Sequence, residues 1–323
     1  MKLLIPGGAG YIGSHMVRYA QEHNHEVVVL DNFSTGNDWS IKDCEVIEAN
    51  LVDQENLLKL LKGRKFDGVI HFAAKSLVGE SLKEPSLYYQ NNLVGSLNLI
   101  DVMIKNDINN LVFSSSAAIF GNPKMDKISE SHIKNPINPY GKSKLMVENI
   151  LEDLCLSTGL NALCLRYFNA AGAHKSGEIG ESHEPETHLI PSILKAVLDN
   201  KTDLKVFGND YNTHDGTCIR DYVHVEDLAN AHLLGLENMK KLKGFSAFNL
   251  GNGSGFSVLD IIKECEKVTN TKISYQVEKK REGDPAILVA DNKLANNELN
   301  WKPKYKKINE IIESAWMWHS RNQ

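Results

Sequence analysis

A glycine-rich turn close to the N-terminus restricts the fold of this chain more than any other feature. An apolar stretch, residues 2–6, runs into Gly7-Gly8-Ala9-Gly10-Tyr11-Ile12-Gly13, and a helix is expected over residues 11–22. The glycines fit both G-x-x-G-x-x-G and G-x-G-x-x-G. Such spacing allows a tight turn and lets the backbone approach a pyrophosphate at the helix N-terminus. The sequence therefore predicts a dinucleotide-binding βαβ unit.

An acidic residue at the end of the second predicted strand indicates which dinucleotide is bound. This strand covers residues 26–30 and is followed by Asp31. A carboxylate about twenty residues after the glycines binds a ribose 2′-hydroxyl and repels a 2′-phosphate. The order of strand, glycines, helix, strand and acid predicts NAD rather than NADP.

Strands and helices alternate along the first half of the chain. Strands are predicted near 2–6, 26–30, 45–48, 67–71, 110–114 and 161–167, and helices near 11–22, 53–62, 86–106 and 142–157. Several strands are almost entirely apolar, as expected where both faces of a sheet are covered. We predict an α/β fold, a doubly wound parallel (Rossmann) sheet with helices on both sides.

The pattern changes after about Gly172. Residues 173–190 are rich in Gly, His, Glu and Pro and lack periodicity, so we expect a substrate loop there. The predicted division is an NAD-binding domain over 1–172 and a smaller mixed α/β substrate domain over 173–323. Segments near 220–240 can pack back on the first domain.

Composition excludes several classes of protein. The net charge is −5, and no basic run indicates nucleic-acid binding. The five cysteines are scattered and never spaced C-x-x-C, which predicts reduced thiols in the cytoplasm. No apolar stretch approaches the roughly 20 residues that span a bilayer, and the first apolar run is too short for a signal peptide.

A tyrosine and a lysine four residues apart, Tyr140 and Lys144, stand in a segment with helical apolar spacing. Positions i and i+4 share a helix face, so the ammonium can lie beneath the phenol. At about 5 Å it would lower the phenol pKa by roughly two, and an oxidised nicotinamide would lower it further. The alternative is an ordinary surface pair, which the N-terminal dinucleotide signature disfavours.

Three serines, Ser114 to Ser116, end an apolar strand. Ligands bind beyond the carboxyl ends of strands in such sheets, so hydroxyls here can face a substrate. From the residues alone, a simple strand-ending turn is equally consistent.

Motifs along essentially the whole chain resemble the UDP-glucose 4-epimerases of the extended short-chain dehydrogenase/reductase family. The glycine turn and the Tyr/Lys pair are shared across the wider family, and the motifs of the C-terminal half point to nucleotide-sugar epimerases. Besides those already given, the matching motifs are Leu30-Asp31-Asn32, His71 to Lys75, Ser114 to Ala117, Arg166 to Asn169, Phe207 to Tyr211, Arg220 to His224 and Arg281-Glu282-Gly283-Asp284.

The resemblance implies an NAD-dependent isomerase of galactose metabolism that interconverts UDP-galactose and UDP-glucose. In such enzymes C4 is oxidised transiently to a 4-keto sugar, which turns over before hydride returns to its opposite face. Tyr140 would exchange the proton of the 4-hydroxyl, Ser116 would hydrogen-bond that oxygen, and Lys144 would hold the nicotinamide ribose. The resemblance also implies a homodimer, formed by the helix of Tyr140 and the one before it.

The resemblance assigns binding residues one by one. Cofactor contacts are Gly7, Gly10, Tyr11, Ile12, Gly13, Asp31, Asn32, Asn50, Leu51, Phe72, Ala73, Ala74, Lys75, Ser114, Tyr140, Lys144 and Tyr167. Substrate contacts are Ser116, Tyr140, Phe168, Asn169, His188, Leu189, Phe207, Arg220, Arg281, Asp284 and Leu288. Leu288 stands where relatives restrict the sugar with tyrosine, so UDP-N-acetyl sugars are expected as weaker substrates.

Some positions depart from the family pattern. Asn50 replaces the usual aspartate of the adenine pocket, Ala118 replaces a threonine beside the catalytic serine, His188 replaces an asparagine, and Pro6 replaces a threonine. None of them touches the Tyr/Lys pair.

The histidines of the 173–190 loop invite a metal interpretation. His174, His183 and His188 lie in an irregular segment without evident ligand spacing. We therefore predict no metal site.

Two other functions stay open. A 4,6-dehydratase or another C4 oxidoreductase would share the fold, but dehydratases carry Thr-Asp-Glu where this chain has Ser-Ser-Ala. A non-catalytic NAD-sensing protein is the alternative from another class, and the intact Tyr140, Lys144 and Ser116 argue against it.

Overall fold

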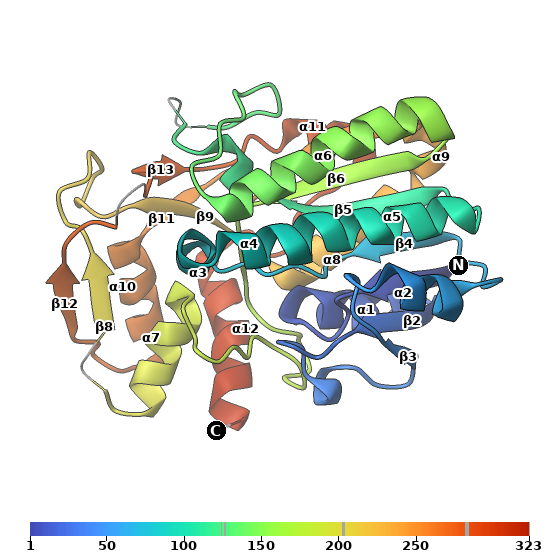
Figure 1. The fold of residues 1–323 in the computed structure, drawn as a ribbon. Helices are drawn as coiled ribbons and strands as arrows, with labels where there is room; N and C mark the ends of the chain where they lie inside the picture. Colours follow the sequence, from blue (N-terminus) through green and yellow to red (C-terminus); the bar gives the residue numbers. More distant parts are fainter. Residues whose placement is uncertain (124, 126, 202–203, 282–283, 323) are drawn as a thin grey trace.

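A seven-stranded parallel sheet forms the centre of the molecule (Figure 1), with the strand order β10-β6-β5-β4-β1-β2-β3. The computed structural model describes residues 1–123, 125, 127–201, 204–281 and 284–322. All neighbouring strands of this sheet are parallel, which confirms the predicted fold class. The strands are β1 (Lys2–Pro6), β2 (Glu26–Asp31), β3 (Glu45–Glu48), β4 (Gly68–His71), β5 (Asn110–Ser116), β6 (Asn161–Tyr167) and β10 (Phe245–Leu250).

Helices cover both faces of this sheet, each over its own core. On one face α1 (Tyr11–Glu22) packs against α8 (Val225–Glu237), and on the other lie α2 (Gln54–Leu61), α5 (Gly95–Lys105) and α6 (Pro139–Thr158). Leu3 and Ile5 of β1 belong to the first core and Leu4 to the second. Because alternate side chains enter different cores, residues 3–5 of this strand are all apolar.

The predicted helix over 86–106 is not continuous. It consists of α4 (Pro85–Tyr88), a π-helical segment η2 (Tyr89–Val94) and α5. Single π turns inside helices are frequent at functional sites because they redirect side chains without ending the helix.

The predicted helix over 142–157 begins earlier, at Pro139. Asn138 caps it by accepting a hydrogen bond of 2.8 Å from the Gly141 amide, and proline at the first helical position needs no amide partner. Tyr140 therefore lies in the first turn of α6, on the same helix as Lys144.

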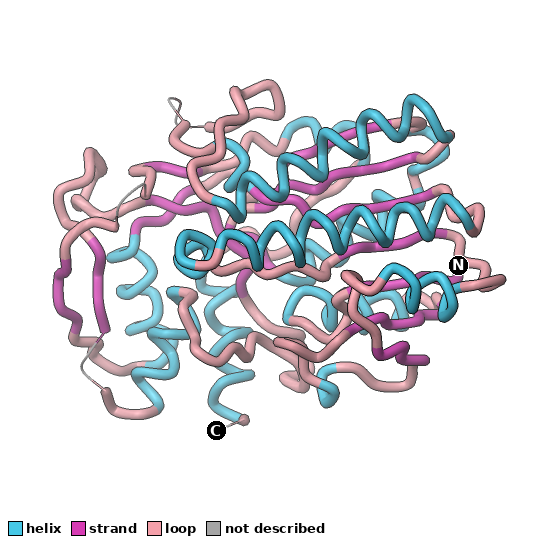
Figure 2. The backbone as a smooth tube through the Cα atoms, viewed as in Figure 1, coloured by secondary structure: helices cyan, strands magenta, loops and turns pink. Residues whose placement is uncertain are grey.

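The C-terminal part of the chain builds a second, smaller lobe (Figure 2). Its core lies among α7 (Leu189–Leu198), α10 (Val258–Thr269) and α12 (Ile308–Arg321). β9 (Ile219–His224) pairs with β7 (Asn169–Ala171), β11 (Gly255–Ser257) and β13 (Ile287–Leu288), while β8 (Leu204–Phe207) pairs with β12 (Tyr275–Glu278). Between these parts, α8 and β10 return to the large sheet.

Short elements complete the described chain. They are η1 (Asp38–Ser40), α3 (Val78–Lys83), η3 (Ala117–Phe120), α9 (Met239–Leu242) and α11 (Lys293–Leu299). No helix within the described ranges has both the length and the hydrophobicity needed to cross a bilayer.

Candidate active site

The glycine turn between β1 and α1 forms a cradle that side chains would fill. Gly7 has φ +78°, and a Cβ there would lie 2.3 Å from the Ala73 amide nitrogen. A Cβ on Gly13 would lie 2.1 Å from the Gly7 carbonyl oxygen. The turn thus needs glycine for close approach, and a pyrophosphate at the α1 N-terminus fits this geometry.

A pocket opens beside this turn, at the carboxyl ends of β1, β2 and β4. Ten of the predicted cofactor residues line it: Gly7, Gly10, Asp31, Asn32, Asn50, Leu51, Phe72, Ala73, Ala74 and Lys75. It is also lined by residues that were not predicted, namely Leu30, Ser34, Thr35, Gly36, Ala49 and Asn91. The polar run that follows Asp31 could have indicated three of these residues, Ser34, Thr35 and Gly36.

Asp31 ties the second strand to the glycine turn. Its Oδ2 accepts a hydrogen bond of 2.9 Å from the Ala9 amide, and its Oδ1 accepts one of 2.9 Å from the Phe33 amide. These bonds fix the carboxylate at the rim of the pocket, where a ribose hydroxyl would meet its remaining lone pairs.

Asn92 of the π segment holds another wall of this pocket. Its side chain accepts a hydrogen bond from the Lys75 amide (2.8 Å) and donates one to the Lys75 carbonyl (2.9 Å). It also donates to Ser143 Oγ of α6 (3.3 Å). Asn92 therefore connects the pocket lining to the helix of Tyr140, a role that the sequence analysis did not foresee.

The predicted catalytic residues meet where β5 ends and α6 begins. The Lys144 ammonium donates to the Ser114 carbonyl (2.7 Å) and lies 4.7 Å from the centre of the Phe113 ring. Burial lowers the pKa of Lys144 to about 7. Ser116 hydrogen-bonds Tyr140, and its Oγ also accepts from the Ala118 amide (3.2 Å).

The expected lowering of the Tyr140 pKa by Lys144 is wrong for this structure. Burial raises the pKa of Tyr140, and the hydrogen bond with Ser116 opposes the rise only in part. The physical reason is burial, because removing the phenolate from water outweighs the stabilising hydrogen bond.

The other predicted cofactor residues lie outside the pocket lining. The Tyr167 hydroxyl hydrogen-bonds Ser114 Oγ. Tyr11 donates to the Gly172 carbonyl (2.6 Å), and Ile12 packs against the core under α1.

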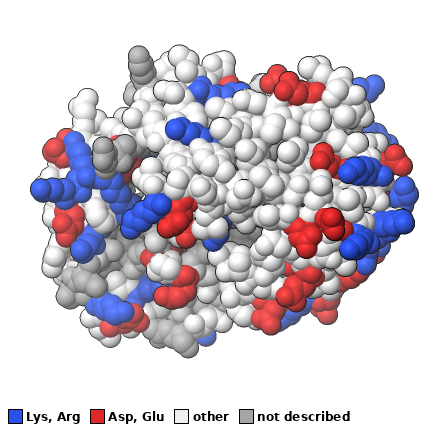
Figure 3. Space-filling model, in the orientation of Figure 1, with Lys and Arg blue, Asp and Glu red and all other residues white. Residues whose placement is uncertain are grey.

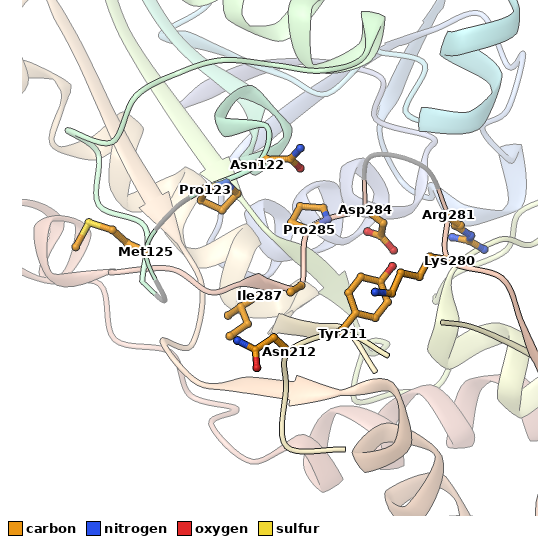
Figure 4. A pocket seen from close by; sticks show the side chains of 11 residues that line it. Asn122, Pro123, Met125, Tyr211, Asn212, Lys280, Arg281, Asp284, Pro285 and Ile287 are labelled. Carbon is orange, nitrogen blue, oxygen red and sulfur yellow. The ribbon is translucent and has the colours of Figure 1, made fainter. Parts of the chain in front are cut away.

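The predicted nucleotide contacts gather at a second cavity of about 550 Å³ (Figure 4). Arg281 and Asp284 line it, together with Tyr211 and Lys280. The Asp284 carboxylate accepts a hydrogen bond from the Arg220 guanidinium. Glu282 and Gly283 of the same motif are outside the described residues.

Two of these predicted contacts touch each other. The Arg281 guanidinium lies 4.0 Å from the centre of the Phe207 ring, in cation–π contact. The structure thus brings all four predicted nucleotide residues together in two pairs.

Two of the predicted sugar contacts lie beside the residues that follow Ser116. Phe168 and Leu288 pack against the buried cluster Ala117, Ile119, Phe120 and Ile128, and β13 places Leu288 opposite Arg220 of β9. Asn169 begins β7, and His188 and Leu189 stand at the start of α7.

His188 is held by two carboxylates. Its Nδ1 lies 2.8 Å from Glu181 Oε1 and 3.1 Å from Glu186 Oε1. Burial opposes protonation, but the bonds to these carboxylates outweigh it and raise the pKa of His188 to about 10. The pKa of Glu181 falls to about 2, because burial is outweighed by the imidazoles of His183 and His188.

The view that these histidines lack ligand spacing is wrong for two of them. His183 and His188 lie with Glu181 and Glu186 in a group whose donor atoms are all within 4.8 Å of one another. The sequence signal that could have revealed this group is the alternation of Glu181 and Glu186 with His183 and His188 along the segment. His174 lies elsewhere, 3.2 Å from Glu22 and 3.4 Å from Glu226.

Known proteins similar to this chain agree with the arrangement. The model of the NAD dependent epimerase/dehydratase family matches residues 3–251. A UDP-glucose 4-epimerase of Halalkalibacterium halodurans is 45% identical over 322 residues, covering 100% of this chain and 96% of the relative.

Two solved structures share the whole fold. A crystal structure of a UDP-glucose 4-epimerase superposes with a TM-score of 0.96 at 44% identity, covering 100% of this chain and 98% of the other. The Brucella ovis UDP-glucose 4-epimerase in complex with NAD gives a TM-score of 0.94 at 42% identity, covering 98% and 97%.

Proposed function

The chain belongs to the NAD dependent epimerase/dehydratase family, and on that premise we propose that it is an isomerase that interconverts UDP-galactose and UDP-glucose. The observation that carries this proposal is the position of Tyr140, Ser116 and Lys144. They stand together at the end of β5, and full-length relatives at 45% identity are UDP-glucose 4-epimerases.

The cofactor is NAD, and the residues present fit it. The glycine turn would hold the pyrophosphate, Asp31 the adenosine ribose, and the pocket with Asn50 and Leu51 the adenine. When bound, NAD would supply the acceptor and the donor of the hydride at sugar C4 and, in its oxidised form, a positive charge.

The protein residues control the proton of the 4-hydroxyl. Tyr140 takes this proton as the sugar is oxidised and gives it back as the sugar is reduced, while Ser116 hydrogen-bonds the same oxygen. Because burial raises the Tyr140 pKa, the phenol ionises only when positive charge is close. Oxidised NAD would bring that charge, and Lys144 would hold the nicotinamide ribose.

A dehydratase is the less suitable alternative. Elimination of water needs a free acid and base near the sugar. Among the described residues, Glu148 is a carboxylate that hydrogen-bonds the end of β5. Both of its oxygens are occupied, by Ser115 (2.6 Å) and by Arg166 (2.9 and 2.6 Å).

Turnover of UDP-galactose tests these functions against one another. The expected product is UDP-glucose, with no net consumption of added NAD. A 4-keto-6-deoxy product would indicate a dehydratase, and binding of NAD without turnover would indicate a sensor.

We propose that N-acetylated UDP-sugars are weaker substrates. Leu288 packs beside Phe168 and Ala117, close to the end of β5, and its side chain is smaller than tyrosine by several heavy atoms. Leu288→Tyr should lower kcat/KM for UDP-N-acetylglucosamine at least tenfold and leave UDP-glucose nearly unchanged. Equal N-acetyl activity in both proteins, or none in the wild type, would reject Leu288 as the gate.

We also propose a domain division, an oligomeric state and a cellular compartment for the chain. Residues 1–172 bind NAD and residues 173–323 bind the UDP-sugar, with α8 and β10 supporting the first part. The chain acts as a homodimer in the cytoplasm, and its five free cysteines suit a reducing compartment.

A further inference from the structure

The segment that leads into α7 gathers two carboxylates and two imidazoles at one point. The side chains of Glu181 and Glu186 are only 4% and 6% exposed, although this segment has no regular structure before Leu189. Two ionised carboxylates buried side by side are unfavourable unless positive charge or a metal ion accompanies them.

Two atoms of the group have unused bonding capacity. Glu186 Oε2 and His183 Nδ1 are buried, and neither has a hydrogen-bond partner in the part of the chain that the structure describes. They lie 3.9 Å apart. Buried polar atoms are nearly always satisfied, so a pair of unsatisfied ones facing each other indicates a missing partner between them.

The spacing of the donor atoms fits a small ion. His188 Nδ1 is 2.8 Å from Glu181 Oε1 and 3.1 Å from Glu186 Oε1, and His183 Nδ1 is 3.3 Å from Glu181 Oε1. Bonds of about 2.0–2.1 Å in a tetrahedral zinc site separate neighbouring donors by about 3.3 Å. These separations, and the 3.9 Å between His183 Nδ1 and Glu186 Oε2, lie within about 0.6 Å of that value.

We propose that Glu181, His183, Glu186 and His188 bind one divalent first-row transition-metal ion, with Zn²⁺ the best match, and that the ion replaces the proton that His188 Nδ1 shares with the two carboxylates and releases it to solvent. Two imidazoles favour such an ion over Ca²⁺ and Mg²⁺, which prefer oxygen donors alone. This site goes beyond the proposed function, because the hydride and proton transfers use none of its four side chains as acid or base.

The residues around the proposed site indicate that the ion would stabilise the fold. The Trp318 indole of α12 donates to the Glu181 carbonyl (3.2 Å), and the Tyr11 ring meets His183 edge-on with centroids 6.3 Å apart. An ion held here connects α12, the glycine turn and the start of α7. It thereby fixes the loop that leads into α7.

Calorimetric titration of the chelator-treated full chain with Zn²⁺ tests the site directly. We expect one ion per chain, with an increase in melting temperature. His183→Ala and Glu186→Gln should each weaken binding at least tenfold and remove most of that increase. His214→Ala is the matched control, because His214 belongs to a separate, more exposed group with Asp215 and Asp260, and it should leave the tight site unchanged.

Cobalt substitution identifies the ligands. Co²⁺ in the wild type should give visible bands typical of a tetrahedral site without thiolate charge transfer, since no cysteine is among the ligands. Absence of stoichiometric binding, unchanged affinity in both variants, or thiolate charge transfer would each overturn the proposal. These measurements do not depend on turnover, so they remain decisive even if the proposed epimerase activity is absent.

Discussion

The Tyr140 phenol is subject to two opposing influences, since burial raises its pKa and the hydrogen bond with Ser116 lowers it. Tyr140→Phe removes the proton acceptor and keeps the ring. We expect kcat to fall by about 10²–10⁴, while the Kd for a UDP-sugar stays within a factor of about two to three of wild type. Steady-state kinetics and calorimetry measure the two effects separately.

A neighbouring tyrosine provides the control for this variant. The Tyr88 ring lies 6.5 Å from that of Tyr140, but its hydroxyl is bonded to the Leu77 carbonyl and to Glu80, each at 2.7 Å. Tyr88→Phe should therefore keep most of kcat. A Tyr140→Phe variant with the wild-type rate would show that another group exchanges the proton.

The lowered pKa of Lys144 predicts that the stability of the folded protein depends on pH. Burial lowers its pKa to about 7, below the value of about 10.4 in an unfolded chain. Below pH 7 both states are protonated and the folded protein bears the full cost of the buried charge. Between pH 7 and about 10 only the unfolded chain binds the proton, so this residue raises the unfolding free energy by up to about 1.4 kcal/mol per pH unit.

Lys144→Met removes that contribution. Relative to the variant, wild type should be least stable at pH 6 and should gain stability as the pH rises from 7 to 9. Urea unfolding of both proteins across this range measures the difference, in which other titrations cancel. A difference that does not change with pH would contradict a buried lysine with a lowered pKa, and the variant should also lose most activity.

Among the elements, the π segment η2 is the one whose position affects the cofactor most directly. Purified protein should keep NAD(H) through dialysis, because a cofactor regenerated in every cycle has no need to leave. Asn92→Ala removes four hydrogen bonds, two with Lys75 and one with Asn91 of the pocket lining and one with Ser143 of α6. We expect the Kd for NAD to rise at least tenfold, about 1.4 kcal/mol or more.

Asn106→Ala is the matched control at the end of α5. Its side chain also bonds backbone groups, the Val102 carbonyl at 2.8 Å and the Gly63 amide at 3.3 Å, but it does not line the pocket. Nicotinamide released from each denatured protein is the measurement. Full retention of NAD(H) by Asn92→Ala would mean that the pocket wall does not need this connection.

The elements show which features a sequence can predict. β1 and β2 were predictable because a strand with both faces buried is a continuous apolar run. The π turn was not, because residues 89–94 have no local signal that separates it from α-helix, and Asn92 is placed there by its bonds to distant Lys75 and Ser143. The early start of α6 was readable in principle, since Asn138 and Pro139 form a standard N-terminus.

The candidate site shows the same difference between residues with a local sequence signal and residues placed by contacts with distant segments. The glycines and Asp31 were found because a fixed spacing determines their contacts with a cofactor. The pairing of Arg220 with Asp284, and of Arg281 with Phe207, depends on how distant segments pack, so sequence alone could name these residues without placing them. The missed glutamates at 181 and 186 belong to the same class.

At the scale of the whole molecule, the chain crosses between its two lobes more than once. β10 pairs with β6 along six residues, from Phe245 opposite Ala162 to Leu250 opposite Tyr167. This pairing requires α8 to bring the chain back to the edge of the large sheet. A boundary near residue 172 therefore marks where the sequence pattern changes. It does not divide the chain into two separately folded domains, because β10 returns to the large sheet.

The surface of the large domain leads to the last prediction. Figure 3 shows a broad region without charged side chains over α5 and α6, where Leu97 is 37% and Met146 is 40% exposed. A second copy of the chain is the proposed partner for this face, as a pair of helices from each protomer can form a four-helix contact.

Sedimentation at micromolar concentration should therefore give twice the chain mass of 36.1 kDa. Leu97→Glu combined with Met146→Glu should shift the protein to a single chain, since burying unpaired charges opposes association. Val277→Glu, at a 49% exposed position on β12, is the control and should remain dimeric. A wild-type mass of 36.1 kDa, or a double variant that stays dimeric, would exclude this interface.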